Sequence, residues 1–233
     1  MRNKQSGFTL VEIAIVLVII GLLLGGVLKG QELINSAKVK NMANDFRNIP
    51  IFIYGYQDKF KRLPGDDVSA VTNVGATAGH NGNGNGVIQG SWDETNPAAA
   101  NNANESVFFW EHIRKGNFAS GATDFSSTAA ATASLPTNAD GGRIGISGTM
   151  PITTMIGGSY YICSDGIDGK FARQLDLTID DGVSDKGAMM SIAQTAAGQT
   201  QAKGPAASPA AASSEANPSG YADGTRYTVC MTY

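Results

Sequence analysis

The stretch Phe8-Thr-Leu-Val-Glu12, continued by Ile13-Ala-Ile-Val-Leu-Val-Ile-Ile-Gly-Leu-Leu-Leu-Gly-Gly-Val-Leu28, decides how this chain is organised. It contains 21 residues, which as a helix span about 32 Å at about 1.5 Å per residue, enough to cross a bilayer. Glu12 is its only charged residue. An acid inside such a segment is costly and is a functional candidate by default, so the sequence predicts a specific partner for Glu12. The plainer interpretation is that Glu12 only reaches the membrane interface.

A short basic leader precedes the apolar run. Residues 1–7 contain Arg2 and Lys4 and end in Gly7. A secretory signal peptide would have an apolar region of about 7–15 residues with a small-residue cleavage site after it. Here the run is longer, and its small residue, Gly7, lies before it. Cleavage between Gly7 and Phe8 would therefore leave the apolar segment on the mature chain.

Gly7-Phe8-Thr-Leu-Val-Glu12 resembles the processing site of type IV pilins and of the pseudopilins of type II secretion. The resemblance covers about residues 1–60 and is much weaker beyond. It implies that a prepilin peptidase cleaves after Gly7 and N-methylates Phe8. It also implies that Glu12 pairs with the N-terminal amine of Phe8 on a neighbouring subunit, which would fix the register between subunits.

The same resemblance implies a location and partners. The subunit would wait in the bacterial inner membrane as a single-pass protein with its head in the periplasm. Inner-membrane assembly machinery would then extract it into a homo-oligomeric or mixed filament, either an extracellular pilus or a periplasmic pseudopilus. The alternative is a minor pilin or membrane-anchored binding module at a filament tip, serving adhesion, DNA uptake or secretion. A third possibility is a single-pass protein that never polymerises.

Composition and charge argue against two classes of function. The 233 residues include 17 basic and 20 acidic side chains, a formal net charge of −3, and the basic residues are scattered. Nothing in this balance suggests a groove for nucleic acid. The sequence has no Ser-His-Asp set, phosphate loop or cofactor fingerprint, and His80 and His112 are isolated. We therefore expect a protein that is not an enzyme.

The apolar run continues into an amphipathic segment at residues 29–63. Its apolar residues recur at spacings of 3 and 4, which is one face of a helix: Val39, Met42, Phe46, Ile49, Ile53, Tyr56, Phe60 and Leu63. We expect this face to pack on the protein's own head rather than in a coiled coil. Pro50 lies inside the pattern and predicts a kink, because it removes a backbone donor and crowds the carbonyl of Phe46.

The remainder, residues 64–233, reads as a globular head of the α+β class. A helix is expected over Glu105–Lys115, and low-complexity sequence at about 196–220 indicates a surface loop. Apolar segments bounded by turn residues predict an antiparallel sheet with one face covered by the long helix. The expected strands are Arg143–Ser147, Ser159–Cys163, Gln174–Asp180 and Tyr227–Tyr233.

The chain has two cysteines, Cys163 and Cys230, both on expected strands. In an oxidising periplasm they would be joined, closing a loop that contains the low-complexity segment. The resemblance agrees, since many pilins close a C-terminal loop with a disulfide. Two free thiols in a cytosolic protein would conflict with the N-terminal signal.

The segment Asn81-Gly-Asn-Gly-Asn-Gly86 has the alternating spacing of a calcium loop. It lacks the first aspartate and the bidentate acid twelve positions on, where Trp92 stands. Affinity would be poor unless a nearby aspartate folds over the loop. We interpret the segment as a turn-rich loop, with calcium as the alternative and no other cofactor. The calcium candidates are Asp66, Asp67, Asn81, Asn83 and Asn85.

Overall fold

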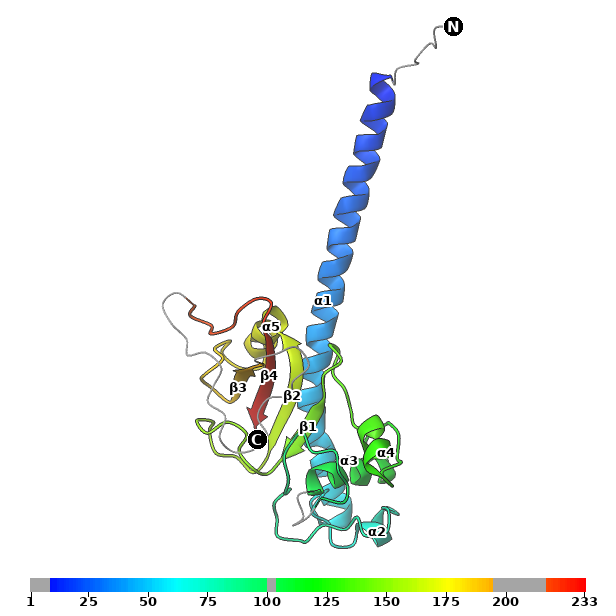
Figure 1. Cartoon of the computed structure of the whole chain (residues 1–233), viewed down its shortest axis with the longest axis vertical. Helices are drawn as coiled ribbons and strands as arrows, with labels where there is room; N and C mark the ends of the chain where they lie inside the picture. Colours follow the sequence, from blue (N-terminus) through cyan, green and yellow to red (C-terminus); the bar gives the residue numbers. More distant parts are fainter. Residues whose placement is uncertain (1–8, 100–103, 195–216) are drawn as a thin grey trace. The chain divides into compact units, whose positions relative to one another are not determined.

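The computed structural model describes residues 9–99, 104–194 and 217–233 (Figure 1). The chain divides into two compact units, Met1–Lys38 and Val39–Tyr233. Helix α1 (Leu10–Phe60) begins in the first unit and ends in the second. The leader with Gly7 and Phe8, and most of the low-complexity stretch at 196–220, lie outside the described residues.

A four-stranded antiparallel sheet forms the centre of the second unit (Figure 1). Its strands are β1 (Ile144–Ser147), β2 (Tyr161–Asp168), β3 (Met189–Ala193) and β4 (Arg226–Thr232), in the order β1-β2-β4-β3. The C-terminal strand β4 therefore lies between β2 and β3. The α+β class and the antiparallel sheet are confirmed, and three of the four expected strands are present.

The amphipathic face of α1 packs in the core of the second unit. Six of the eight residues of the predicted face, which continues past the end of α1 to Leu63, are buried, namely Val39, Met42, Phe46, Ile49, Ile53 and Tyr56. The first five share one apolar cluster with the inward residues of the sheet, including Ile146, Ile162 and Val229. The expectation that the stripe covers the head is confirmed. Burying a large apolar side chain contributes about 1.5–3 kcal/mol, so this face is a major source of stability.

Pro50 does not end α1, which continues uninterrupted from Leu10 to Phe60. In a regular helix the N–H of residue 50 would donate to the carbonyl oxygen of Phe46, and proline has no N–H. The hydroxyl of Tyr233 donates to that carbonyl oxygen instead, at 2.7 Å. The end of the chain thus replaces the hydrogen bond that Pro50 removes, which keeps a buried carbonyl satisfied.

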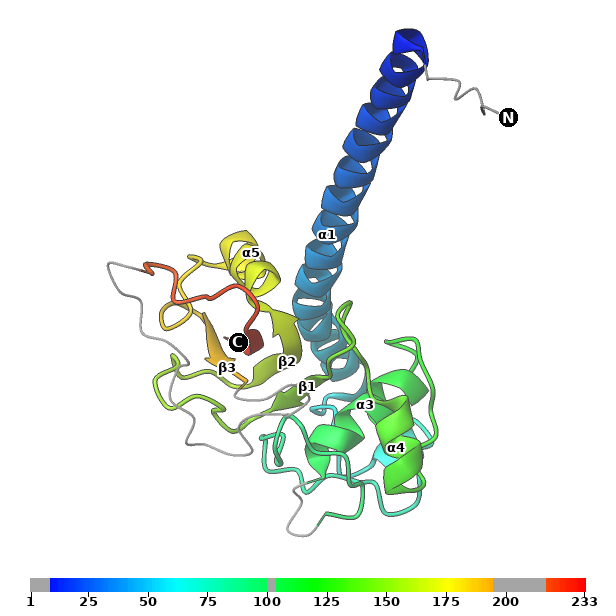
Figure 2. The same ribbon diagram turned by 45° about the horizontal axis from the view of Figure 1, so that its top comes forward.

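Three helices lie between α1 and the sheet in sequence: α2 (Ala70–Asn73), α3 (Glu105–Lys115) and α4 (Thr128–Ser134). The bounds of α3 are those expected from the sequence. Helix α4 was not expected. It begins where the side chain of Ser127 accepts a hydrogen bond from the N–H of Ala130. Figures 1 and 2 show α3 and α4 side by side. The Arg114 guanidinium of α3 donates a hydrogen bond to the carbonyl oxygen of Ser134 in α4.

The expected strand Gln174–Asp180 is wrong, because this segment lies in helix α5 (Gly169–Ile179). The alternation of Leu175, Leu177 and Ile179 suggested a strand, but Leu177 is 58 % exposed and belongs to the outer side. The buried residues Phe171, Ala172 and Leu175 instead follow a helical spacing. The side chain of Asp168 starts the helix by accepting a hydrogen bond from the N–H of Lys170.

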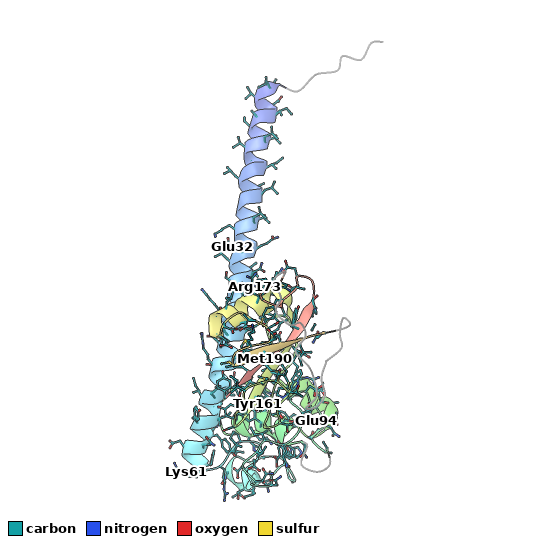
Figure 3. All side chains as sticks on the ribbon, turned by 90° about the vertical axis from the view of Figure 1, so that its left-hand side faces the viewer. Glu32, Lys61, Glu94, Tyr161, Arg173 and Met190 are labelled. Atoms are coloured by element: carbon teal, nitrogen blue, oxygen red, sulfur yellow. A yellow bond between two sulfur atoms is a disulfide. The ribbon has the colours of Figure 1, made fainter. Side chains whose placement is uncertain are left out.

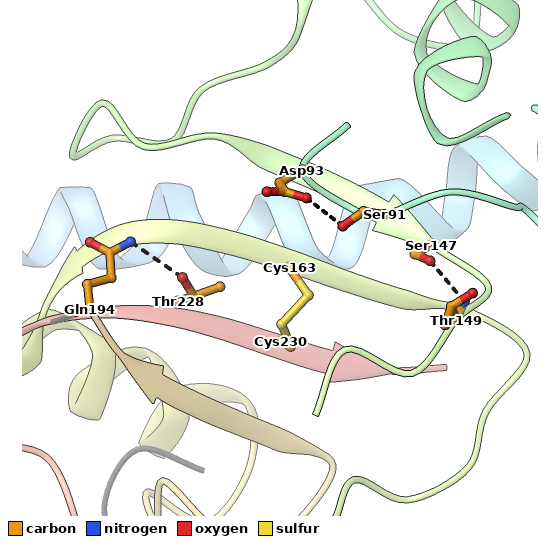
Figure 4. The surroundings of a disulfide bond; sticks show 8 residues. All are labelled: Ser91, Asp93, Ser147, Thr149, Cys163, Gln194, Thr228 and Cys230. Atoms are coloured by element: carbon orange, nitrogen blue, oxygen red, sulfur yellow. Dashed lines mark hydrogen bonds between the residues drawn. A yellow bond between two sulfur atoms is a disulfide. The ribbon is translucent and has the colours of Figure 1, made fainter. Parts of the chain in front are cut away.

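The second face of the sheet carries a smaller cluster built around a disulfide between Cys163 and Cys230 (Figure 4). The two cysteines are direct partners in the pairing of β2 with β4, and both are fully buried. Their neighbours in the cluster include Trp92, Met155 and Met190. The disulfide expected from the sequence is therefore confirmed.

The described end of the low-complexity stretch is packed rather than free. Ser219 is buried, and its carbonyl oxygen accepts a hydrogen bond from the N–H of Ser184 at 2.9 Å. Tyr221 follows directly and inserts its hydroxyl between Ser191 and Asp176. In the described residues, the expected surface loop is therefore packed at Ser219, and the chain packs again at Tyr221 before β4 begins.

Candidate assembly site

The first unit presents an apolar helix surface that the chain itself does not cover. In the described residues, the part of α1 before the second unit is long and apolar enough to cross a membrane, with mean hydropathy 2.8 over its best window and none of that window buried. Its side chains project on all sides of the helix as far as the labelled Glu32 (Figure 3). Large side chains such as Leu10, Leu22 and Leu24 are between 59 and 86 % exposed. A surface of this kind requires lipid or other helices.

Glu12 lies in the first turn of α1 and folds back onto the start of the helix. Its Oε2 accepts hydrogen bonds from the backbone N–H and from the hydroxyl of Thr9, both at 2.8 Å. The Thr9 hydroxyl in turn accepts from the N–H of Glu12 at 3.3 Å. Thr9 and Glu12 therefore form a reciprocal capping box, which satisfies donors that a helix N-terminus otherwise leaves unpaired.

This cap changes what the sequence implied for Glu12. The carboxylate has two donors from its own chain, so it does not lack a hydrogen-bond partner within the subunit. The Thr-x-x-Glu spacing of residues 9–12 is the sequence signal for such a cap. The pairing of Glu12 with the amine of Phe8 on another subunit stays a prediction, and Gly7 and Phe8 themselves lie outside the described residues.

Four glycines in this part of α1 have no role in the packing of the chain itself. A Cβ atom built on Gly21, Gly25, Gly26 or Gly30 would meet nothing within 4 Å. Glycine inside a helix costs about 1 kcal/mol relative to alanine. Their spacing gives two pairs four residues apart, 21 with 25 and 26 with 30, which is the pattern that allows close approach of helices in membranes.

The calcium candidates come together, but their oxygens accept hydrogen bonds from the protein. The Asp66 carboxylate accepts from the backbone N–H of Gly84, Asn85 and Gly86, at 2.5, 3.2 and 2.6 Å. Asp67 accepts from the hydroxyl of Tyr56 at 2.7 Å and from two further donors. A loop that turns its N–H groups toward a carboxylate has the polarity of an anion site, so its arrangement does not fit a calcium ion.

A second group of carboxylates is explained in the same way. Asp176, Asp180 and Asp181 have oxygens within 4.8 Å of one another. Each accepts a hydrogen bond from a backbone N–H: Asp176 from Gly182 and Asp181 from Val183, both in the turn that follows α5, and Asp180 from Met189, the first residue of β3. Burial raises the pKa of Asp176 to about 6, although the Tyr221 hydroxyl and the Gly182 N–H lower it. This group shapes the turn, and nothing further in it indicates a ligand.

The two histidines, which are far apart in sequence, lie in one buried cluster next to α3. The imidazole of His112 is fully buried, with Nδ1 accepting from the N–H of Gly65 at 2.9 Å and Nε2 donating to the carbonyl oxygen of His80 at 2.8 Å. The ring of His80 contacts the Glu111 carboxylate at 2.5 Å, and Lys115 reaches the same carboxylate at 2.8 Å. The cluster ties α3 to the loop over 65–80.

The pKa values in this cluster follow from burial and pairing. Burial alone would raise the pKa of Glu111, but hydrogen bonds from His80, Lys115 and Thr77 outweigh it and lower the pKa to about 2. Burial lowers the pKa of His112 to about 4, against the opposing effects of the His80 carbonyl and the charges of Glu111 and Asp67. His112 is therefore neutral at pH 7, as its acceptor role toward Gly65 requires.

Neutral His112 makes a pH-dependent contribution to stability. Its pKa is lower in the folded state than the value of 6.5 of a free histidine, so its contribution is complete above pH 6.5 and is lost as the pH falls toward 4. We expect His112 to lower the free energy of unfolding by about 2 kcal/mol between about pH 7.5 and pH 5.

Buried acids change the free energy of unfolding in the opposite direction. Burial raises the pKa of Asp45 and Asp176 to about 6, so their contribution to stability falls as the pH rises. The measurement is therefore the difference between wild type and His112→Gln in urea unfolding at the two pH values, in which these other groups cancel. Parallel stability curves for the two proteins would contradict the assignment.

Comparison with known proteins identifies the N-terminal signal. A family model described as the prokaryotic N-terminal methylation motif matches residues 2–28. This motif is the prepilin-type signal of type IV pilins and pseudopilins, which confirms the resemblance, and that family consists of structural subunits. No curated protein and no solved structure matches the chain. The match covers the leader and the apolar run, and it does not extend to the second unit.

Proposed function

We propose that this chain is a structural subunit of a type IV pilus or pseudopilus, cleaved after Gly7, methylated at Phe8 and assembled through α1. The observation that carries the proposal is the overlap of the methylation motif at residues 2–28 with a helix whose large apolar side chains are exposed from Leu10 to Leu28. A bilayer covers these side chains before assembly, and the helices of neighbouring subunits cover them afterwards. The glycine pairs at 21 and 25 and at 26 and 30 support close helix packing.

Two features support a location on the outer side of the inner membrane for the second unit. The chain carries a prepilin-type signal, and the unit is closed by a buried disulfide between Cys163 and Cys230. Disulfides form and persist in oxidising compartments such as the periplasm. In this proposal the partners are a prepilin peptidase, inner-membrane assembly machinery, and other copies of the chain or related pilins.

Intact-mass analysis of the protein from membranes and from sheared filaments tests the proposal. We expect the mass of residues 8–233 plus one methyl group, less two hydrogens for the disulfide. A mass that includes residues 1–7 would contradict processing. A processed chain that is a trace component of sheared filaments would favour the minor-pilin or tip-module alternative over a major subunit.

A further inference from the structure

The loop Asn81–Gly86 contains three Asn-Gly pairs in succession, and the fold requires glycine in each. Gly84 and Gly86 have positive φ angles of 78° and 86°, which side-chain-bearing residues rarely adopt. A Cβ atom on Gly82 would lie 2.3 Å from the Cα atom of Asp66, so only glycine fits there.

The asparagines are required as well, because their side chains form the turns of the loop. The Oδ1 atom of Asn83 accepts from the N–H of Asn85, and the Oδ1 atom of Asn85 accepts from the N–H of Val87, both at 2.9 Å. These are Asx-turns, in which an asparagine side chain bonds the backbone two residues on. The Oδ1 atom of Asn81 accepts from the N–H of Val71 at 2.9 Å.

An Asn-Gly pair is the dipeptide most prone to spontaneous deamidation, because glycine offers no side chain to hinder the reaction. The backbone nitrogen of the glycine attacks Cγ of the asparagine, a new C–N bond forms, and the side-chain nitrogen leaves as ammonia. Water then opens the resulting succinimide at either carbonyl, which leaves aspartate or isoaspartate. The three asparagines are exposed to solvent, so water is at hand.

We propose that Asp66 and the backbone of Asp67 protect these three latent modification sites by holding each attacking nitrogen in a hydrogen bond. The N–H of Gly84 donates to Oδ1 of Asp66 at 2.5 Å, and the N–H of Gly86 donates to Oδ2 at 2.6 Å. The N–H of Gly82 donates to the carbonyl oxygen of Asp67 at 2.9 Å. A nitrogen held in this way must first break its hydrogen bond before it can turn toward Cγ.

Asp66 and the loop stabilise each other. Asp66 is buried at 3 % exposure, and its carboxylate is satisfied by the same N–H groups that it restrains. Deamidation at Asn83 or Asn85 would place a second carboxylate beside that of Asp66, and like charges at this range repel. One event would therefore weaken the hold on the neighbouring pair. The role of Asp66 is then to keep an exposed loop chemically intact over the life of the protein.

The test is the rate of deamidation at each asparagine, measured by peptide mass spectrometry on the full-length chain in detergent micelles. In native wild type we expect Asn83 and Asn85 to react about tenfold to a hundredfold more slowly than in the urea-unfolded chain, because a hydrogen bond to a charged group has to break first. In Asp66→Ala we expect these two sites to approach the unfolded rate, with Asp66→Asn in between, since an amide keeps one acceptor oxygen.

Two controls separate this role from a general loss of structure. The nitrogen that would attack Asn81 is that of Gly82, which is held by the carbonyl oxygen of Asp67, so the rate at Asn81 should change much less in the Asp66 variants. The exposed acid Asp58 offers Asp58→Ala as a matched variant with wild-type rates. If Asp66→Ala unfolds, deamidation accelerates at all three asparagines together. In that case, the protection of the Gly84 and Gly86 amide protons from hydrogen exchange in wild type tests the proposal instead. Native sites that react as fast as unfolded ones, exchange without protection at both glycines, or a folded Asp66→Ala with wild-type rates would each overturn the proposal.

Discussion

Filaments are expected to be absent, or sharply reduced, in cells that make only Glu12→Ala, while membrane insertion and cleavage after Gly7 continue. Insertion depends on the apolar run, which the substitution makes more apolar. On the proposed function, assembly would depend on the carboxylate, because it is the one charged group between Phe8 and Leu28 and thus the one available partner for a new N-terminal amine in an apolar surrounding. Removing one partner of a buried ion pair leaves the other charge uncompensated, which is strongly unfavourable.

The cap formed with Thr9 supplies the control for this experiment. If Glu12 acts only by capping α1, Thr9→Val should impair assembly similarly, since it removes a donor from Oε2 and the acceptor for the N–H of Glu12. If Glu12 acts by pairing with a neighbouring amine, Thr9→Val should retain filaments. Glu32→Ala is the matched acid on the same helix, where Glu32 pairs with Lys29 at 2.6 Å and is exposed.

The measurement combines electron microscopy of sheared filaments with intact-mass analysis of the membrane fraction. Normal filaments from Glu12→Ala would contradict an assembly role for this residue. A loss of filaments accompanied by an uncleaved chain would place the defect at processing instead.

The parts of the fold that could be predicted are those in which one local pattern determines the structure. The stripe from Val39 to Leu63 has a single helical period, and Glu105–Lys115 combines an apolar centre with suitable charges at both ends. The prediction of a strand at Gln174–Asp180 failed because three alternating apolar residues fit a strand and a helix equally well. The residues that decide in favour of a helix, Phe171 and Ala172, lie before this segment in the sequence.

The polar interactions of the second unit could not be predicted, because they join residues far apart in sequence through backbone groups. Asp66 is satisfied by amide groups about twenty residues away, and His112 bonds the backbone of Gly65 and His80. Backbone donors are present at every residue except proline, so they leave no signal in the sequence. The bond from Tyr233 to the carbonyl of Phe46, which compensates for Pro50, is hidden for the same reason.

Removing the disulfide is expected to cause the largest loss of stability from a single covalent change in the second unit. Cys163 and Cys230 are separated by 67 positions, and on the chain-entropy model a cross-link over such a loop contributes about 4 kcal/mol by restricting the unfolded chain. In the folded state the bond joins residues that the pairing of β2 with β4 already places opposite each other. Its loss should therefore lower the free energy of unfolding while the strand register is kept.

The cleanest measurement compares oxidised and reduced wild type in urea, with the full chain in detergent micelles, because both proteins then have the same side chains. The double variant Cys163→Ala with Cys230→Ala should lose more than reduced wild type. It also leaves a cavity beside Trp92 and Met190, and cavities in a packed core add to the cost. A difference below about 1 kcal/mol between oxidised and reduced wild type would contradict the entropic account. It would mean that the unfolded chain already restrains this loop without the bond.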